Sequence, residues 1–519
     1  MAEKRMPLVC IILDGWGIWE EKKGNAIALA KTPNIDHISK KYPMTLLNAS
    51  GKYVGVPTGQ PGNSEAGHMN IGAGRIVEQD NVVVSKSINT GTFFRNPAFL
   101  QASNHVNKHG SNIHLMGLLS DGASPHSDDD HLLSLISLYI SKTKSNIYLH
   151  LFTDGRDSPP YSALKNLGNY KNVFDSQQVK ISTIMGRFYA MDRKKAWDRT
   201  KLAYETMVNG KAEFEAEDAL SAVSSAYNRG ESDEYIKPTV IKKDGKAIGP
   251  IKENDALVFF NLRSDRARQL TKVFGQEDFE EKNPDAFKRE NFPNDLVFVA
   301  LTDFGPDLEN IFTAYPGIDV AESLPYALKG YRQLYVAETE KYAHITYFFN
   351  GGYDHPISGE VRINVPSKDV ISYAQAPEMS TLESADRVIQ AVKKQEFDFI
   401  LINFASPDMV GHTGDLKAAI QAIEYVDDSV GNILEATKAR EGVVVVTADH
   451  GNVEEMINLK TGEVDTQHSI NLVPFIIVDD QQKYKLQKTG SLSNVAPTLL
   501  DILGVEKPQL MVAESLIKK

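Results

Sequence analysis

Short apolar runs recur along the whole chain, and polar or small residues bound each of them. Their length and their content of β-branched residues are typical of strands that are buried on both faces of a sheet. The runs that predict strands are Leu8–Leu13, Ile113–Leu119, Ile147–Phe152, Val179–Met185, Ala256–Phe260, Leu296–Leu301, Ile345–Phe349, Phe397–Phe404, Val443–Thr447 and Pro474–Val478.

Helix-like segments lie between many of these runs, for example Ser134–Ser141, Asp192–Val208 and Leu416–Ala439. The alternation of strands with helices indicates an α/β fold with mainly parallel sheets. Open α/β sheets form their binding sites at the carboxyl ends of the strands. The residues that directly follow each run are therefore the first candidates for chemistry.

The residues that follow the runs differ in kind along the chain. Asp, His and Ser follow the runs near both ends, whereas arginines follow the runs in the middle. This difference predicts two α/β domains, the second inserted into the first. We expect residues 1–80 and 314–519 to form one domain and residues 81–313 the other, with crossings in Glu78–Ser85 and Gly305–Pro316.

The charge of the chain narrows the choice of partners. Its 519 residues include 56 Lys and Arg against 68 Asp and Glu, a formal net charge of 56 − 68 = −12. An acidic chain argues against general binding to nucleic acids or anionic membranes. A small anionic substrate stays possible, because a local cluster of basic residues acts independently of the mean charge.

The single cysteine and the apolar runs indicate the compartment. Cys10 excludes an intrachain disulfide, favours a reducing environment and is expected to be a buried thiol. The first apolar run stops at Asp14, which is too short for a signal-peptide core, and no stretch approaches the ~18 apolar residues of a membrane span. We therefore expect a cytoplasmic protein.

Acidic residues and histidines from separate segments form the first candidate site. They are Asp14, Asp408, His412, Asp449, His450 and His468. Mixed carboxylate and imidazole ligands suit Mn²⁺, Zn²⁺ or Co²⁺, and Mg²⁺ where oxygen dominates. Two such ions about 3.5–4 Å apart are the usual arrangement for phosphoryl transfer. The alternative is that each Asp caps a helix and each His is an ordinary packed side chain.

Ser64 stands in the glycine-containing stretch Thr58–His68, at the start of a helix predicted to begin near Glu65. There its hydroxyl would face amide donors and the positive end of the helix dipole, which stabilise a phosphoserine dianion. A metal ion beside the hydroxyl would make it a nucleophile. The alternative is a plain N-cap serine.

Arginines and one histidine form the second candidate site in the middle of the chain. Paired guanidinium donors match carboxylate and phosphate groups, so a substrate that carries both would explain their number. The alternative is ion pairing with surface acids, and Asp157 is either a proton acceptor or a salt-bridge partner. The residues are His126, Arg156, Asp157, Arg187, Arg193, Arg263 and Arg266.

Six motifs occur in the order found in one enzyme family. They are Asp14–Gly17, Gly62–His68, Thr153–Asp157, Asn261–Arg266, Asp408–Gly414 and Thr447–Asn452. Over nearly all of residues 6–515 the chain resembles the 2,3-bisphosphoglycerate-independent phosphoglycerate mutases of the alkaline phosphatase superfamily. The resemblance implies a metal-dependent isomerase that interconverts 3-phosphoglycerate and 2-phosphoglycerate in glycolysis and gluconeogenesis. It also implies an alkaline-phosphatase-like domain built from both chain ends, an inserted transferase domain, and a monomer.

The resemblance further assigns roles to the candidate residues and implies two divalent ions as cofactors, with Mn²⁺ expected ahead of Mg²⁺ or Co²⁺. One ion would be held by Asp408, His412 and His468, and the other by Asp14, Ser64, Asp449 and His450. Ser64 would become phosphoserine, Lys341 would contact the phosphate, and the middle cluster from His126 to Arg266 would hold the glycerate part.

Two positions depart from the family pattern, and two other enzyme classes share part of it. Ser406-Pro407 stands where Asn-Ala is usual before Asp408, and Ser469 stands where threonine is usual after His468. A metal-dependent phosphatase or phosphodiesterase would share the Asp, His and Ser set without needing the arginines. A phosphopentomutase-like enzyme would share the metal lobe, and a phosphoserine-dependent binding module is the non-enzymatic alternative.

Overall fold

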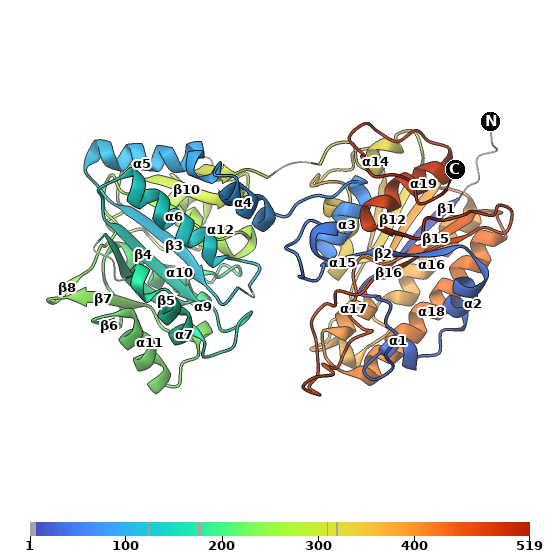
Figure 1. Ribbon diagram of the computed structural model, residues 1–519, viewed down its shortest axis with the longest axis horizontal. Helices are drawn as coiled ribbons and strands as arrows, with labels where there is room; N and C mark the ends of the chain where they lie inside the picture. The colour runs from blue at the N-terminus through green and yellow to red at the C-terminus, as the bar shows by residue number, and fades with distance from the viewer. Residues whose placement is uncertain (1–6, 123, 175–177, 309, 318–319, 519) are drawn as a thin grey trace. The chain divides into compact units, whose positions relative to one another are not determined.

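The structure is a computed structural model that describes residues 7–122, 124–174, 178–308, 310–317 and 320–518. The chain forms two compact units (Figure 1). The outer unit consists of Met1–Gln79 with Ile318–Lys519, and the inserted unit of Asp80–Gly317. The expected crossings followed residues 80 and 313, and those between the units follow residues 79 and 317. Both units are α/β and their sheets are largely parallel, which confirms the predicted fold class.

The outer unit is built on an eight-stranded sheet with the order β13-β12-β14-β1-β15-β16-β2-β17 among the described residues. Its strands pair in parallel, except that β16 runs antiparallel to both neighbours. The strands are β1 (Leu8–Leu13), β2 (Met44–Asn48), β12 (Gln333–Glu338), β13 (Val361–Val365), β14 (Phe399–Phe404), β15 (Val443–Thr447), β16 (Val473–Val478) and β17 (Thr489–Ser491).

Helices of the outer unit pack in two groups with the sheet between them (Figure 1). One group is α1 (Ala26–Leu29), α2 (Pro33–Lys41), α16 (Thr381–Lys394), α17 (Ser406–Gly411) and α18 (Leu416–Lys438). The other is α3 (Ser64–Ala73), α14 (Leu324–Ala327), α15 (Thr339–Ala343) with its continuation η4 (His344–Phe348), and α19 (Val495–Leu503). Central strands such as β1 are buried along their whole length, and Cys10 is buried with them as expected.

The inserted unit is built on a second sheet with the order β11-β10-β9-β3-β4-β5-β7-β6, with β8 paired to β7. β7 runs antiparallel to β5 and β8, and the other pairs are parallel. The strands are β3 (Ile113–Leu119), β4 (Ile147–Thr153), β5 (Val179–Gly186), β6 (Phe214–Ala216), β7 (Thr239–Lys243), β8 (Lys246–Ala247), β9 (Ala256–Phe259), β10 (Val297–Thr302) and β11 (Phe312–Tyr315).

Two separate cores lie on the two faces of this second sheet. Along β3, Ile113 and Leu115 join one core and Met116 and Leu118 join the other, as the alternation of side chains in a strand requires. One core includes α4 (Asp80–Asn89), α5 (Pro97–His109), α6 (Asp129–Lys142), α7 (Ala163–Asn169), α8 (Lys171–Phe174) and α11 (Ala219–Asn228). The other includes α9 (Arg187–Ala190), α10 (Trp197–Val208), α12 (Ser264–Gly275) and α13 (Phe279–Lys282).

One predicted strand is wrong. The apolar run Ile345–Phe349 is not a strand, because His344–Phe348 form a π-helix that continues α15. The run is apolar because it packs against α3, where Gly72 lets the backbone of Phe349 come close. The other nine predicted strands form with shifts of up to two residues at their ends.

Replacement of Gly72 by alanine is expected to destabilise the outer unit. An added Cβ would lie 2.0 Å from the carbonyl oxygen of Phe349, a backbone atom that cannot turn away. Such overpacking costs about 1–3 kcal/mol and exceeds the helix-propensity gain of about 1 kcal/mol. The measurement is the free energy of unfolding in urea. The control is Gly168→Ala in α7, where nothing lies within 4 Å of the added Cβ, and equal stability of the Gly72 variant and the parent would contradict the packing.

Candidate active site

The outer unit collects its candidate residues at one edge of the sheet. Asp14 follows β1, Asp408 lies in the short helix after β14, and Asp449 follows β15. These three strands are parallel neighbours, so their carboxyl ends meet at the same edge. The three carboxylates are buried, at no more than 2% exposure each.

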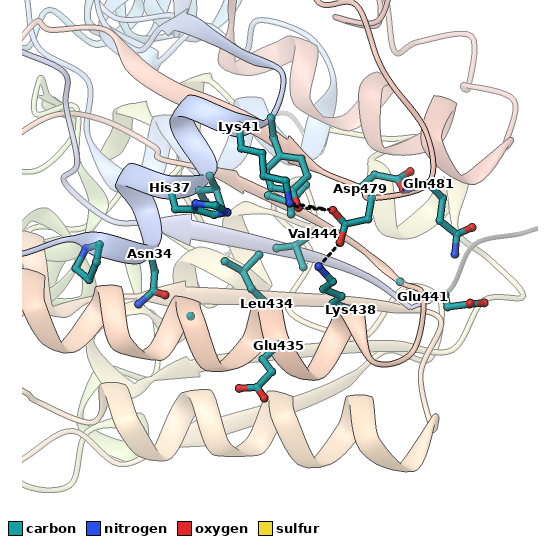
Figure 2. Close-up of a pocket in the computed structure, with 17 residues that line it drawn as sticks. Asn34, His37, Lys41, Leu434, Glu435, Lys438, Glu441, Val444, Asp479 and Gln481 are labelled. Atoms are coloured by element: carbon teal, nitrogen blue, oxygen red, sulfur yellow. Dashed lines mark hydrogen bonds and ion pairs between the residues drawn. The ribbon is translucent and has the colours of Figure 1, made fainter.

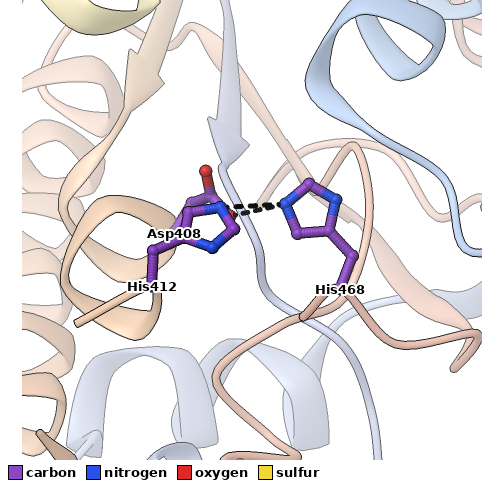
Figure 3. Close-up of side chains that lie close together, drawn as sticks. All are labelled: Asp408, His412 and His468. Carbon is purple, nitrogen blue, oxygen red and sulfur yellow. Dashed lines mark hydrogen bonds and ion pairs between the residues drawn. The ribbon is translucent and has the colours of Figure 1, made fainter. Parts of the chain in front are cut away.

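The predicted set of Asp408, His412 and His468 comes together (Figure 3). The two Nε2 atoms lie 3.1 Å apart and 3.4 and 3.3 Å from Oδ1 of Asp408. The other nitrogen of each ring donates a hydrogen bond to a backbone carbonyl. Nδ1 of His412 donates to the carbonyl of Thr466 at 2.8 Å, and Nδ1 of His468 donates to that of Gly62 at 2.9 Å. Such bonds fix the tautomer that leaves the Nε2 lone pair for a metal.

The second predicted set, Asp14, Ser64, Asp449 and His450, converges on Nε2 of His450. This atom lies 2.9 Å from Oγ of Ser64, 3.4 Å from Oδ2 of Asp449 and 3.5 Å from Oδ1 of Asp14. The Ser64 hydroxyl also donates to Asp14 at 3.1 Å. Each of the three oxygens therefore lies within 3.5 Å of this nitrogen. The groups whose ligand atoms all lie within 4.8 Å of one another combine the same residues differently, as Asp14, Asp408 and His450 and as Asp14, His68 and Asp449.

Ser64 is the first residue of α3 rather than its N-cap. The cap is Asn63, whose side chain accepts from the backbone N–H of Ala66 at 2.8 Å. The hydroxyl of Ser64 therefore plays no capping role, and the alternative of a plain N-cap serine is wrong. It contacts the buried groups around it instead.

Lys341 lies between the two sets. Its ammonium group donates to Asp14 and Ser64, both at 2.7 Å, and to Asp408 at 2.6 Å. Burial alone would lower the pKa of Lys341, but Asp14, Asp408 and Asp449 raise it, so the side chain is charged. It supplies one positive charge for this group of carboxylates.

Carboxylates outnumber the lysine side chains at this edge of the sheet. Asp14, Asp408 and Asp449 share the single ammonium group of Lys341. Burial lowers the pKa values of His68 and His412, but Asp449 and Asp408 respectively raise them overall, so these two histidines also help to offset the negative charge. Buried charge of one sign is costly unless it is paired. Burial first, and then the neighbouring Asp449, raise the pKa of Asp14, which is the response of a crowded carboxylate. The gathering of carboxylate and imidazole donors at one place fits divalent metal ions.

The inserted unit collects its candidates after β3, β4, β5 and β9. Arg187 is buried and donates to Asp154 and Asp157, each at 2.6 Å. Asp157 also accepts from Ser124 at 2.8 Å, and although burial raises its pKa, the bonds from Arg187 and Ser124 lower it overall. Asp157 is thus an ionised salt-bridge partner in this structure.

The arginines of the inserted unit lie within electrostatic reach of one another. Burial lowers the pKa of Arg266, and the neighbouring charges of Arg187, Arg193 and Arg156 lower it further. Arg193 is paired with Asp265 at 2.7 Å, and Arg156 lies 3.5 Å from Glu234. Mutual repulsion of this kind favours an anion among the guanidinium groups.

His126 completes this cluster. Burial first, and then Arg187, lower its pKa to about 4, and Arg263 acts in the same direction. His126 is 5% exposed, and its Nδ1 lies 3.9 Å from Asp265. All seven residues predicted for this site therefore lie in the inserted unit. His126 and Arg266 each lie close enough to Arg187 for its charge to lower their pKa values.

Comparisons with known proteins identify the family of this chain. The Metalloenzyme superfamily matches residues 6–507. The 2,3-bisphosphoglycerate-independent phosphoglycerate mutase of Clostridioides difficile is 47% identical, over 99% of this chain and all of that protein. Enzyme 2 of the same name from Methanosarcina barkeri is 45% identical over the full length of both. The chain belongs to this mutase family.

A solved structure supports the same assignment. Leishmania mexicana phosphoglycerate mutase, studied at low cobalt concentration, is 30% identical and has a TM-score of 0.78, with 99% of this chain and 98% of that chain covered. As a member of the Metalloenzyme superfamily the protein is a metal-binding enzyme. None of the described helices has the length and apolar character needed to cross a membrane.

The two departures from the mutase pattern have local explanations. Pro407 occupies the first turn of α17, where its missing N–H costs nothing, and the Ser406 hydroxyl bonds with that of Thr381 at 2.9 Å. Ser469 donates its hydroxyl to Glu454. Neither change removes a candidate ligand.

Several residues that surround the candidate ligands did not emerge as candidates from the sequence. His68 contacts Asp449 at 3.3 Å and the Ser64 carbonyl at 2.8 Å, and Asn403 donates to Asp14 at 2.7 Å. Asn403 is the one polar residue in the apolar strand β14, a signal that could have found it. His68 stands inside a quoted motif, where the helix period would have placed it one turn after Ser64.

The outer unit also holds a pocket of about 590 Å³ that contains none of the candidate residues (Figure 2). It lies between α2 and α18 at the amino end of β15, whereas Asp449 follows the carboxyl end. Its central carboxylate, Asp480, is already paired with Lys41 and Lys438. Nothing in it resembles the chemistry of the two clusters.

The low pKa of His126 predicts a pH dependence of stability. The pKa is about 4 in the folded protein and about 6.5 in the unfolded chain, so only the unfolded chain binds a proton between these values. The contribution of neutral His126 to the free energy of unfolding is therefore complete above about pH 6.5 and is lost as the pH falls towards 4. His126→Gln should flatten the pH dependence of the unfolding free energy by about 1–3 kcal/mol over this window.

The measurement is urea unfolding between pH 4.5 and 7.5, with the exposed His37→Gln as the control. An NMR titration of the His126 ring near pH 6.5 in the folded protein would contradict the assigned environment.

Proposed function

We propose that this protein interconverts 3-phosphoglycerate and 2-phosphoglycerate through a phosphoserine at Ser64, independently of 2,3-bisphosphoglycerate. The observation that carries the proposal is the surroundings of the Ser64 hydroxyl. It lies 2.7 Å from the ammonium of Lys341, 2.9 Å from His450 and 3.1 Å from Asp14, and it plays no capping role. A hydroxyl among basic and cationic groups at a helix start is suited to attack phosphorus.

Two divalent ions, Mn²⁺ by preference with Co²⁺ or Mg²⁺ as substitutes, are proposed as cofactors. Asp408, His412 and His468 would hold one ion. Asp14, Ser64, Asp449 and His450 would hold the other, because the three oxygens lie within 3.5 Å of Nε2 of His450. When bound, such ions lower the pKa of a coordinated hydroxyl and neutralise phosphoryl oxygens. The cobalt named for the Leishmania mexicana enzyme is compatible with this donor set.

The chain's own residues then divide the work of the first transfer. Oγ of Ser64 forms the new bond to phosphorus while the bond from phosphorus to the glycerate oxygen breaks. Lys341 stabilises the negative charge on the transferring oxygens, and the N–H groups at the start of α3 do the same through the helix dipole.

The inserted unit is proposed to hold the glycerate until the phosphoryl group returns. His126, Arg156, Arg187, Arg193, Arg263 and Arg266 would bind its carboxylate and hydroxyl groups. Asp157 is proposed to accept the proton of the attacking hydroxyl, because its carboxylate is ionised at neutral pH. The proposed reaction uses residues of both units, because Ser64 belongs to one and the arginines belong to the other.

The arginine cluster also separates this proposal from its alternatives. A phosphatase or phosphodiesterase releases its leaving group and has no need to retain it, and a scaffold needs no hydroxyl held by a lysine. A phosphopentomutase-like activity would require a different substrate in the same cluster. The family membership favours phosphoglycerate.

We also propose a role in glycolysis and gluconeogenesis, a cytoplasmic location and a monomeric state. The family and the single buried thiol of Cys10 support the pathway and the reducing compartment. No nucleic-acid or membrane partner is expected from the net charge of −12.

The first test is an assay of 3-phosphoglycerate conversion with Mn²⁺ and without 2,3-bisphosphoglycerate. Conversion is expected, chelation should abolish it, and Mn²⁺ or Co²⁺ should restore it.

Ser64→Ala should lose mutase and phosphatase turnover together, because both pass through the same phosphoserine. Full activity of protein verified by elemental analysis to be metal-free would refute the metal requirement, and turnover of Ser64→Ala would refute the nucleophile.

The second test separates the units with Arg263→Ala. The change removes a charge-assisted contact to the glycerate worth roughly 1.5–3 kcal/mol, so mutase activity should fall at least tenfold. Ser64 and the metal ligands are unchanged, so phosphate can still reach the serine, and water would then replace the lost glycerate. Inorganic phosphate and 2-phosphoglycerate are measured in one reaction, and their ratio should rise. Normal turnover with an unchanged ratio would remove Arg263 from the site.

A further inference from the structure

Glu454 is a buried carboxylate that belongs to neither predicted ligand set. It follows the loop Asp449–Asn452, and its side chain is 0% exposed. Within the described residues, the hydrogen-bond donors that reach it are uncharged N–H and O–H groups. A buried carboxylate needs such donors to be tolerated, so its position is fixed by them.

The donors come from three separate loops. Oε2 accepts the backbone N–H of Gly17 and that of Asn452, both at 2.9 Å. Oε1 accepts the hydroxyl of Ser469 and the amide of Asn471, the latter at 3.1 Å. The three loops are those that carry Asp14, the Asp449-His450 pair and His468 in the sequence.

Two short paths lead from Glu454 to the candidate ligands. Asn452, whose N–H bonds Glu454, donates its side-chain amide to Asp408 at 2.8 Å. Ser469, whose hydroxyl bonds Glu454, directly follows His468. A single residue therefore connects Glu454 to each of two candidate ligands: Asn452 connects it to Asp408, and Ser469 connects it to His468.

The loops are built around this carboxylate. A Cβ on Gly17 would lie 2.2 Å from Oε1 of Glu454, and a Cβ on Gly451 would lie 2.3 Å from the same atom. Glycine at both positions lets the backbone approach the carboxylate directly. The N–H of Ser469 also donates to the carbonyl of Gly451 at 3.0 Å, which joins two of the loops beside Glu454.

We propose that Glu454 is a positioning residue which, with Ser469, fixes the three loops so that the Asp408, His412 and His468 set is ready to bind a divalent ion. Glu454 itself touches no substrate. The inference deepens the proposed function and rests on it for the activity readout only, because metal affinity is measured on the chain alone.

The test compares Glu454→Gln with the parent by titration of the metal-free protein with Co²⁺. Glutamine has the same size but presents an NH₂ group to two of the donors, so the loops must separate. Loss of the residues that orient metal ligands typically weakens metal affinity 10–100-fold. We expect a loss of this size in Glu454→Gln, together with a changed visible spectrum of the bound Co²⁺. The matched control is Glu463→Gln, an exposed glutamate of the loop that leads to His468.

Turnover gives an independent readout. Glu454→Gln should lower kcat with Mn²⁺, while KM for 3-phosphoglycerate stays within about twofold, because the residues proposed to bind glycerate are in the inserted unit. A global loss of structure would change both. If the parent binds Co²⁺ more tightly than Glu454→Gln but has no mutase activity, the proposed function fails and the positioning role stands.

Ser469 provides the second set of variants, which keeps the test valid if Glu454→Gln does not fold. Ser469→Ala should weaken Co²⁺ binding, and Ser469→Thr, which keeps the hydroxyl, should retain parental affinity. The double variant Glu454→Gln, Ser469→Ala should lose less than the sum of the two single losses, since both remove the same contact. Parental Co²⁺ affinity and spectrum in Glu454→Gln or in Ser469→Ala would overturn the proposal.

Discussion

The buried negative charge at the edge of the outer sheet is the constraint on which the rest of the site depends. Asp14, Asp408 and Asp449 follow three adjacent parallel strands, and Lys341 compensates only one of their charges. Carboxylates in this position need donors. The backbone N–H of Gly15 in the loop after β1 donates to Asp449, and the side-chain amide of Asn403 in β14 donates to Asp14. The donors hold each carboxylate in place while an oxygen remains for a cation. The parallel order of β14, β1 and β15 thus places three carboxylates together at one edge of the sheet, where they can bind metal ions.

The parts of the fold that the sequence predicts are those that depend on local pattern. Central strands such as Val443–Thr447 are apolar throughout because both of their faces are buried, and the polar residues that follow them then share one edge. Asp449 and His450 were predictable for this reason. The helix period places His68 one turn after Ser64, but its contact with Asp449 is not visible in any local pattern. Glu454 was not predictable, because its role arises from contacts between distant segments.

Lys341 shows where pattern reasoning reaches its limit. The strand before it, Gln333–Glu338, begins and ends with polar residues, so its sequence does not stand out as a buried run. The π-helix after it, His344–Phe348, has the composition of a strand because it packs against α3. Local composition therefore predicted the wrong element after Lys341 and predicted no element before it. The family resemblance identified the lysine, and the structure shows why it is there, since its ammonium joins two carboxylates and the Ser64 hydroxyl.

The division of labour between Asn63 and Ser64 explains how a serine at a helix start stays available for chemistry. A serine at the N-cap uses its oxygen to accept a backbone N–H, which commits one lone pair and fixes the side chain against its own helix. Here Asn63 does this for Ala66, and the helix begins one residue later. Ser64 keeps the favourable end of the helix dipole but directs its hydroxyl towards His450 and Lys341. A shift of the helix start by one residue would exchange these roles, so the identity of the cap is part of the design of the nucleophile.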